Sequence, residues 1–319
     1  MITIDYTNQK DTRSGFGAGI LEAGRNNPNV VALCADLVGS LKLEAFIKEF
    51  PERFVQCGIA EANMTGIAAG MTIGGKVPFA CTFANFATGR VYDQIRQSIA
   101  YSNKNVKIAA SHAGLTLGED GATHQICEDI GLMQMLPNFV VINPCDYNQT
   151  KAATIAAANY EGPVYLRFGR PKWPIFYPAD MPFEIGKAWK IQDGSDVSIF
   201  ATGHLVLKAI EAAVILVEKG YSVDLINIHT IKPIDAEAVI QSVSKTKCAV
   251  TAEEHQVIGG LGSAVGKVIA EHMPVPIEFV GVQDTFGESG TPDQLLEKYG
   301  MSAAHIVEAA LKAIGRKSA

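Results

Sequence analysis

Side chains that could do chemistry come directly after short apolar runs in this sequence. If those runs are parallel strands, their carboxyl ends meet along one edge of a sheet, where ligands of open α/β sheets bind. An acid, aromatic rings, an imidazole and a cation along one edge can orient a small polar ligand and move its protons. The sequence therefore predicts a ligand site at this edge, built from Asp36, Glu61, Phe83, Phe86, His112 and Arg167.

A loop at 111–124 adds a second chemical signal. It contains three glycines, the acids Glu119 and Asp120, and the histidines His112 and His124. Loops of this length tend to be functional or disordered. We expect these side chains to face a polar ligand, with a solvated surface loop as the alternative.

Some of these residues also have an ordinary structural explanation. Glu61 stands at the start of a predicted helix, where a carboxylate complements the helix dipole. Phe83 and Phe86 are three residues apart, a spacing typical of one helical face and of core packing. Their position just past a strand end is what favours a role in binding.

Strand-like and helix-like stretches alternate along the chain. Amphipathic stretches at 92–101 and 147–160 separate apolar runs, and four prolines in 171–188 are typical of a linker. The pattern predicts an α/β fold of two domains, 1–170 and 189–319, each a mostly parallel sheet with helices on both faces. The predicted strands are 30–35, 54–57, 77–81, 106–110, 139–142, 164–166, 197–201, 222–226 and 248–252, and a final helix is predicted at 303–314.

Composition narrows the class of protein. The 319 residues are 48% hydrophobic and 19% charged, which is typical of a soluble globular protein. The net charge of -6 gives no reason to expect a nucleic-acid partner. We expect no membrane association, because no apolar run approaches the roughly 20 residues that span a bilayer. Six scattered cysteines without a CxxC pair, and a start unlike a signal peptide, predict a cytoplasmic protein.

Two motifs resemble ligand sites without matching them. The stretch at 259–262, Gly-Gly-Leu-Gly, lacks the full dinucleotide fingerprint, and a tight turn before a helix explains it equally well. The stretch at 253–255, Glu-Glu-His, is too contiguous for one regular element to direct all three side chains at one metal ion. We expect structural or interface roles for both, and no metal site in this chain.

At these residues the sequence resembles the transketolase family and, more loosely, deoxyxylulose-phosphate synthase. The stretch 58–61 is similar to the family's glutamate motif, and 82–86 with 92–96 to its pyrimidine-stacking segment. The stretch 117–125 is similar to the substrate loop and is the most specific piece. Further similarity to the C-terminal domain, at 251–262 and 286–290, extends the resemblance over nearly the whole chain.

The resemblance implies a subunit and not a complete enzyme. The family has a diphosphate-binding, a pyrimidine-binding and a C-terminal domain, and this chain resembles the last two. The Gly-Asp-Gly motif of the first does not occur here. The implied protein is the C-terminal subunit of a split transketolase, with thiamine diphosphate as cofactor and the Mg²⁺ ligands on an N-terminal partner. A two-plus-two heterotetramer, transferring a two-carbon ketol unit between sugars or sugar phosphates, is the implied assembly.

Roles for the site residues follow from the resemblance. Glu61, His112 and His124 would be catalytic. Glu61 would bind the aminopyrimidine, Phe86 would stack on it, Phe83 would line the pocket, and Asp36 would lie near the cofactor. The implied substrate contacts are Asp120 and His112 to ketose hydroxyls, and His124, Arg13, Ser40 and Arg167, or Arg170 in place of Arg167, to the sugar or its phosphate. Gly89 departs from the family, because many transketolases carry a pocket aromatic there, so the substrate stays open.

Two alternatives remain at this point. A deoxyxylulose-phosphate synthase-like or 2-oxoacid dehydrogenase beta-type subunit would share the domains, although the two-histidine loop argues against the latter. A non-catalytic subunit that stabilises or regulates a partner is a different class of protein. The joint presence of Glu61, His112, Asp120 and His124 argues against that class.

Overall fold

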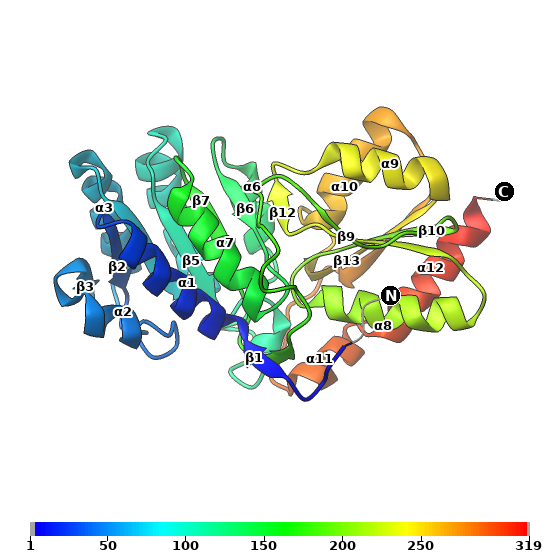
Figure 1. The fold of residues 1–319 in the computed structure, drawn as a ribbon, viewed down its shortest axis with the longest axis horizontal. Helices are drawn as coiled ribbons and strands as arrows, with labels where there is room; N and C mark the ends of the chain where they lie inside the picture. Colours follow the sequence, from blue (N-terminus) through cyan, green and yellow to red (C-terminus); the bar gives the residue numbers. More distant parts are fainter. Residues whose placement is uncertain (1–3, 318–319) are drawn as a thin grey trace.

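Two large sheets organise residues 4–317, the part of the chain described by this computed structural model. The first has seven strands in the order β12–β6–β7–β5–β4–β2–β3, and the second has five in the order β14–β13–β10–β11–β9. They lie side by side along the long axis of the molecule (Figure 1). The strands are β1 (Gln9–Asp11), β2 (Val30–Cys34), β3 (Phe54–Gln56), β4 (Val77–Phe83), β5 (Lys107–Ser111), β6 (Val140–Ile142), β7 (Val164–Arg167), β8 (Lys172–Pro174), β9 (Trp189–Gln192), β10 (Val197–Ala201), β11 (Val223–Asn227), β12 (Thr230–Lys232), β13 (Ala249–Gln256) and β14 (Ile277–Val282).

Helices cover both faces of each sheet. They are α1 (Thr12–Asn26), α2 (Glu44–Glu49), α3 (Glu61–Met71), α4 (Ala84–Ala87), α5 (Tyr92–Gln94), α6 (Asp129–Met135), α7 (Tyr147–Asn159), α8 (Leu205–Glu218), α9 (Ala236–Thr246), α10 (Leu261–His272), α11 (Pro292–Lys298) and α12 (Ala303–Arg316), with the 3-10 turns η1 (Pro51–Arg53), η2 (Thr72–Gly74), η3 (Gly89–Val91) and η5 (Leu115–Leu117) and the π-helical stretch η4 (Ile95–Tyr101).

Parallel pairing dominates both sheets, as the sequence predicts. In the first sheet β3, β2, β4, β5, β7 and β6 run parallel, and in the second β11, β10, β13 and β14 do. β2 is apolar and buried at every position, since a strand covered by helices on both faces needs no polar side. The predicted fold class, two α/β domains with mostly parallel sheets, is confirmed.

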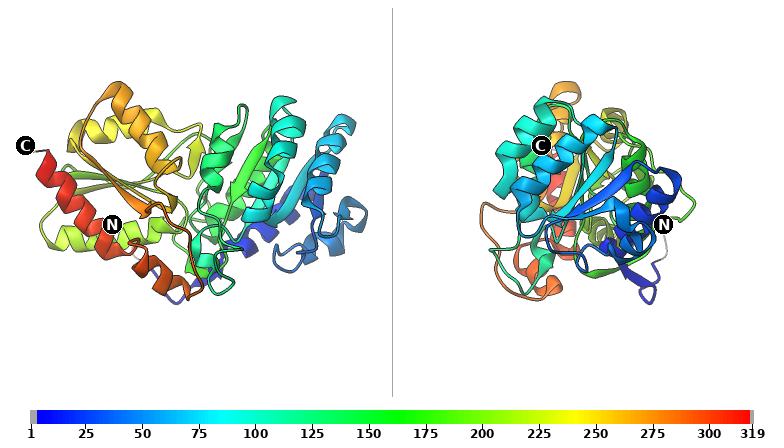
Figure 2. Two further views of the ribbon diagram at one scale, coloured as in Figure 1. Left: turned by 180° about the vertical axis from the view of Figure 1, so that it is seen from behind. Right: turned by 90° about the vertical axis from the view of Figure 1, so that its left-hand side faces the viewer.

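The layers of the first domain follow from its apolar helix faces. Phe16 of α1, Phe46 of α2 and Ala153 of α7 are buried against one face of the sheet. Helices α3, η4 and α6 cover the other face, which Figure 2 shows from behind. Helix α1 lies very close to α7 because Gly15 has no side chain: a Cβ there would lie 2.4 Å from the carbonyl oxygen of Tyr147.

The second domain repeats this plan around a smaller sheet. Helices α8, α11 and α12 pack on one face, and α9 and α10 pack on the other. The short edge strand β9 pairs antiparallel with β11. No helix within residues 4–317 is long and apolar enough to cross a membrane.

The proline-rich segment is anchored to the first domain. Its strand β8 pairs antiparallel with β1, with Trp173 opposite Lys10. Asp146, which caps α7, also accepts hydrogen bonds from the amides of Phe176 and Tyr177 at 2.7 and 2.6 Å. The segment between the domains is therefore fixed in place over much of its length.

One strand crosses between the domains, a feature that the alternating pattern did not predict. β12 comes after the linker, yet it pairs antiparallel with β6 at the edge of the first sheet, with Thr230 opposite Ile142. Buried residues of both halves, such as Tyr165 and Ile231, belong to one continuous apolar cluster. The two domains therefore share a core.

Candidate functional site

An aromatic row lies at the carboxyl end of the first sheet. β4 and β5 pair with Phe83 opposite Ser111, so the next residue, His112, lies beside Phe83. The rings of Phe83 and His112 stack with centroids 3.8 Å apart. Phe86, in α4, stacks on Phe83 at 5.7 Å, and His124 meets Phe86 edge-on at 5.5 Å. Two strand ends and one loop thus bring four predicted residues together.

The backbone adopts an uncommon conformation at two predicted positions. Asp36 and His112 have φ angles of 60° and 59°, in the left-handed region that side chains disfavour. Such residues cluster at ligand sites, where the surrounding structure holds them in place. The amide of Asp36 donates to Gln56 Oε1 at 2.9 Å. This conformation at two strand ends supports a binding role for the edge.

Glu61 begins α3 with a buried carboxylate. Its side chain is 4% exposed, and Arg90 Nη1 donates to its Oε1 at 3.0 Å. The same guanidinium lies over the Phe86 ring, 4.2 Å from the centroid. Arg90 therefore links Glu61 to the aromatic row.

Positive charge surrounds His112. Burial, and then the charges of Arg13 and Arg170, lower the pKa of His112 to about 3. Its imidazole is therefore neutral at physiological pH, and its Nδ1 shares a hydrogen bond with the hydroxyl of Ser111 at 2.8 Å. A neutral imidazole can donate from one nitrogen and accept at the other, which suits recognition of hydroxyl groups.

Arg170 and Arg13 supply that charge. The side chain of Arg170 is 38% exposed; it donates to the carbonyl oxygen of Leu117 at 2.6 Å and pairs with Glu119 at 3.0 Å. Arg13 Nε lies 3.2 Å from Asp11 Oδ1. Arg170 is held by its neighbours and still open to a ligand, and Arg13, whose side chain is 18% exposed, adds a second positive charge beside His112, so this end of the site can receive an anion.

Arg167 is placed differently from the sequence expectation. Its side chain is 3% exposed, and its Nε donates to Asp129 Oδ2 at 2.7 Å. Its Nη2 donates to the carbonyl oxygen of Glu254 at 2.8 Å, and the Tyr165 hydroxyl donates to Asp129 at 2.6 Å. This placement argues against the expected phosphate contact, because the donors are buried and already engaged. Arg170, the alternative, is accessible.

Three further predicted residues lie outside the aromatic row. Asp36 and Asp120 are exposed, and Ser40 is partly buried. Within residues 4–317, none of their side chains hydrogen-bonds to the aromatic row or to Glu61. The structure leaves all three open to solvent without joining them to the row.

The second domain holds the glycine-containing loop in place. Glu254 Oε1 accepts from the amide of Thr116 at 2.6 Å, and Gln125 Nε2 donates to the carbonyl oxygen of Glu288 at 2.9 Å. Gly114 has φ 80°, and a Cβ there would meet Glu254 Oε1 at 2.2 Å. The Glu-Glu-His stretch is therefore an interface element that positions the loop.

Glu253 explains the neighbouring glycine-rich stretch. Its carboxylate accepts from the amides of Leu261 and Gly262 at 2.6 and 2.7 Å, at the start of α10. Burial raises the pKa of Glu253 to about 7, although these two amides act in the opposite direction. The first turn of α10 is thus bound by the protein's own carboxylate.

Comparisons with known proteins decide the family. Residues 8–175 match the transketolase pyrimidine-binding domain, and residues 186–306 match the transketolase C-terminal domain. The chain belongs to the transketolase family.

Its transketolase relatives include separate subunits of similar length. A 6-deoxy-6-sulfo-D-fructose transketolase subunit of Clostridium sp. strain MSTE9 is 42% identical over 299 residues, 94% of this chain and 93% of the relative. One of the subunits of the apulose-4-phosphate transketolase of Phocaeicola vulgatus is 36% identical over 301 residues, 94% and 96% of the two chains.

One solved structure is similar to this chain in its three-dimensional fold. It is described as a split gene transketolase, an inactive beta4 tetramer, and it is 48% identical with a TM-score of 0.91 over 96% of this chain and 99% of its own. These matches confirm the resemblance to the C-terminal subunit of a split transketolase.

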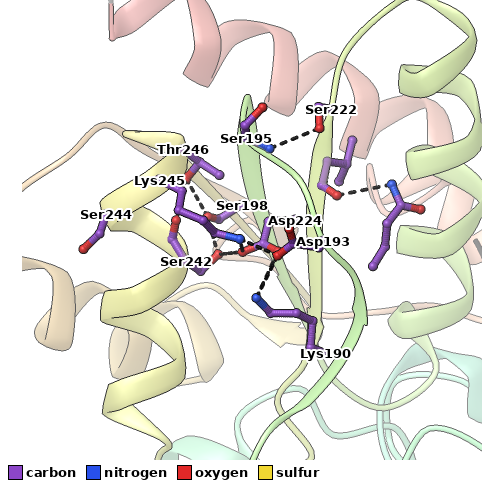
Figure 3. Close-up of polar contacts among 12 residues, drawn as sticks. Lys190, Asp193, Ser195, Ser198, Ser222, Asp224, Ser242, Ser244, Lys245 and Thr246 are labelled. Carbon is purple, nitrogen blue, oxygen red and sulfur yellow. Dashed lines mark hydrogen bonds and ion pairs between the residues drawn. The ribbon is translucent and has the colours of Figure 1, made fainter.

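The transketolase C-terminal domain contains a polar cluster of its own, between β9, β11 and α9 (Figure 3). Buried Asp224 accepts from the Ser242 hydroxyl. Lys190 and Lys245 lie 3.5 and 3.3 Å from its oxygens, and both also pair with Asp193. Two lysines balance two carboxylates, so the cluster joins β9 to its neighbours and has no spare charge for a ligand.

Arg90 is the site residue that sequence reasoning missed in this transketolase chain. The available signal was its position four residues after Phe86, a spacing that brings side chains together on helical turns. Its other partner, Glu61, is 29 residues earlier in the chain. That contact follows from the packing of α3 against η3, which no local pattern specifies.

Proposed function

We propose that this chain is the C-terminal subunit of a split, thiamine-diphosphate-dependent transketolase that transfers a two-carbon ketol unit from a ketose to an aldose. The observation that carries the proposal is the buried carboxylate of Glu61 beside the stacking ring of Phe86, with one planar group, the Arg90 guanidinium, touching both. Such a site suits a flat, nitrogen-containing ring.

The residues present fit the aminopyrimidine half of the cofactor. A guanidinium is planar and carries N–H donors, and it already satisfies the stacking and hydrogen-bonding groups of this site. An aminopyrimidine is also planar and offers ring nitrogens and an amino group. When bound, thiamine diphosphate supplies the nucleophilic carbon and the electron sink for ketol transfer.

Glu61 acts on a proton in this proposal. Its carboxyl is buried in the first turn of α3, where it would share a proton with a ring nitrogen of a bound aminopyrimidine. By holding that proton, Glu61 would act as a general acid–base group. Such groups typically contribute about 100- to 10,000-fold in rate. Phe86 would orient the ring, Phe83 would support Phe86 from the strand end, and Asp36 would be a further cofactor contact.

The loop residues bind the sugar. His112 is neutral, so it can both donate to and accept from a hydroxyl group. His124 meets the edge of Phe86, and Asp120 is exposed in the same loop; both would contact the sugar. His112 and His124 hold hydroxyl protons in place while the ketol unit is transferred.

A substrate phosphate would meet Arg170 and Arg13, and Ser40 would be a further contact. The accessible guanidinium of Arg170 can exchange Glu119 for a phosphate, whereas Arg167 has no accessible donor. Named relatives act on a sulfonated and on a phosphorylated sugar, so an anionic group on the substrate is a shared feature of those proteins. Arg170→Ala should raise KM more for a phosphorylated sugar than for its unphosphorylated form.

A partner chain would supply the rest of the site. Within residues 4–317, no group of three or more His, Cys, Asp or Glu side chains is arranged to hold a metal ion. A buried diphosphate without compensation would be very costly, so its Mg²⁺ and ligands belong to an N-terminal subunit. Two copies of each chain would close two sites around a two-fold axis.

Reconstitution tests this function. The purified chain should be inactive alone, and mixing it with an N-terminal subunit, Mg²⁺ and thiamine diphosphate should give ketol transfer from a ketose phosphate to an aldose phosphate. Light scattering should report a two-plus-two complex. The solved relative described as an inactive beta tetramer supports this dependence on a partner.

Two results would overturn the proposal. Ketol transfer by the chain alone would contradict the split site. Activity of the complex with pyruvate and not with a ketose as donor would favour a deoxyxylulose-phosphate synthase-like subunit instead.

A further inference from the structure

Arg90 lies where the proposed cofactor ring would bind. Its Nη1 is 3.0 Å from Glu61 Oε1, and its guanidinium carbon is 4.2 Å from the centroid of Phe86. These are the two contacts assigned to the aminopyrimidine. A ring that stacks on Phe86 while bonding to Glu61 needs the space that this guanidinium fills.

Exposure shows which partner can move. The side chain of Arg90 is 49% exposed, whereas that of Glu61 is 4% exposed. Arg90 can move into water at little cost to its own charge, because half of its side chain is already exposed. Glu61 cannot, and a buried carboxylate left without a partner is strongly disfavoured.

We propose that Arg90 is a displaceable plug, which keeps the Glu61 carboxylate paired while the site is empty and swings out when the aminopyrimidine arrives. This inference rests on the proposed function, since the displacing group is the cofactor of that function. Arg90 is a positioning residue and not a catalytic one, because it withdraws before the reacting atoms are in place.

The plug and simple charge attraction predict opposite changes in cofactor affinity when Arg90 is removed. Thiamine diphosphate is an anion, so removing a cation near its site should weaken binding if charge attraction dominates. If Arg90 competes with the cofactor, removing Arg90 should strengthen binding. The direction of one change in Kd therefore distinguishes the two.

The experiment is calorimetric titration of thiamine diphosphate with Mg²⁺ into the reconstituted complex. Arg90→Ala should lower Kd about three- to fivefold relative to wild type, the range set by a partly exposed ion pair. Arg90→Lys can still pair with Glu61 but offers no planar group to stack on Phe86. Its Kd should therefore lie between those of wild type and Arg90→Ala. Arg25→Ala is the matched control: it removes an arginine that is 56% exposed and pairs with Glu49 at 2.7 Å, near the end of α1, and it should leave Kd unchanged.

A double substitution sharpens the result. In a Glu61→Gln background the plug loses its charged anchor, so adding Arg90→Ala should change Kd less than twofold. An Arg90→Ala complex that binds the cofactor as well as wild type, or more weakly, would overturn the plug and leave the proposed function intact. If the wild-type complex and every variant fail to bind the cofactor, the proposed function fails and the plug fails with it.

Discussion

Two arginine–carboxylate pairs in this chain have similar N–O distances and different surroundings. Arg167 and Asp129 meet at 2.7 Å with 3% and 0% of their side chains exposed, and Tyr165 and the Glu254 carbonyl complete the group. Arg90 and Glu61 meet at 3.0 Å, but half of the arginine is exposed and its other contact is an aromatic face.

The comparison shows that the number of hydrogen bonds the arginine already makes distinguishes a structural ion pair from one at a binding site better than the N–O distance does. The donors of Arg167 are engaged by both domains, so no ligand can compete for them. Arg90 has one short bond and a stacking contact, and a planar ligand can replace both. A static ion pair indicates a binding site when one partner is buried and the other is free to leave.

The largest expected effect is the response of stability to the same substitution in each pair. Arg167→Ala leaves Asp129 buried and unpaired, so we expect the free energy of unfolding to fall by about 3–5 kcal/mol. Arg90→Ala should lower it by only about 1 kcal/mol, because the space left by a half-exposed side chain admits water that can solvate the Glu61 carboxylate. Chemical denaturation of the isolated chain measures both.

A second variant checks the cause. Arg167→Met combined with Asp129→Leu removes both charges and should recover much of the lost stability. Equal losses for Arg167→Ala and Arg90→Ala would remove the distinction between the pairs.

The next effect is on catalysis. Glu61→Gln keeps the shape of the side chain but cannot share the proton, so kcat of the reconstituted complex should fall by roughly 100-fold or more. The melting temperature should change little, since the amide can still accept from Arg90. Near-wild-type turnover at saturating cofactor would refute the role of Glu61.

A smaller effect is expected on the substrate side. Asp120→Ala and His124→Ala should each weaken sugar binding by about 1–3 kcal/mol, the typical loss for one hydrogen bond to a buried hydroxyl. Steady-state KM values report this change, and cofactor Kd should stay within a few fold. Loss of cofactor binding with unchanged KM would reverse the assignment.

The smallest effect concerns a buried carboxylate with no arginine partner. The folded state raises the pKa of Glu253 to about 7, above the value of about 4.3 for an unfolded glutamate. The stability from this group is therefore present at low pH and is lost as pH rises from about 4.5 through 7. Melting temperatures between pH 5 and 8 should fall less in Glu253→Gln than in wild type; identical slopes would contradict the assignment.

The sequence predicted the sheet edge because that edge depends on local signals. Apolar runs mark strands, parallel strands align their carboxyl ends, and residues after them, such as Phe83 and His112, must then lie close together. Covered strands also need no polar face, which makes runs such as β2 easy to recognise.

The sequence could not rank Arg167 against Arg170 for a physical reason. Both arginines come at or just after the end of β7, and side chains alternate between faces along a strand. Which face meets the second domain depends on Asp129 and Glu254, both distant in sequence. The Glu61–Arg90 contact is long-range in the same way, so only the packed structure shows it.

The strand β12 has a consequence for how the chain can be made and divided. It follows the linker but closes the edge of the first sheet beside β6. During synthesis the edge of the first sheet stays incomplete until residue 232 has left the ribosome. A polypeptide cut at the linker would expose the backbone groups of β6, an edge open to pairing with other chains. A break at the linker would therefore separate β12 from the sheet that it completes, although the sequence places a domain boundary there.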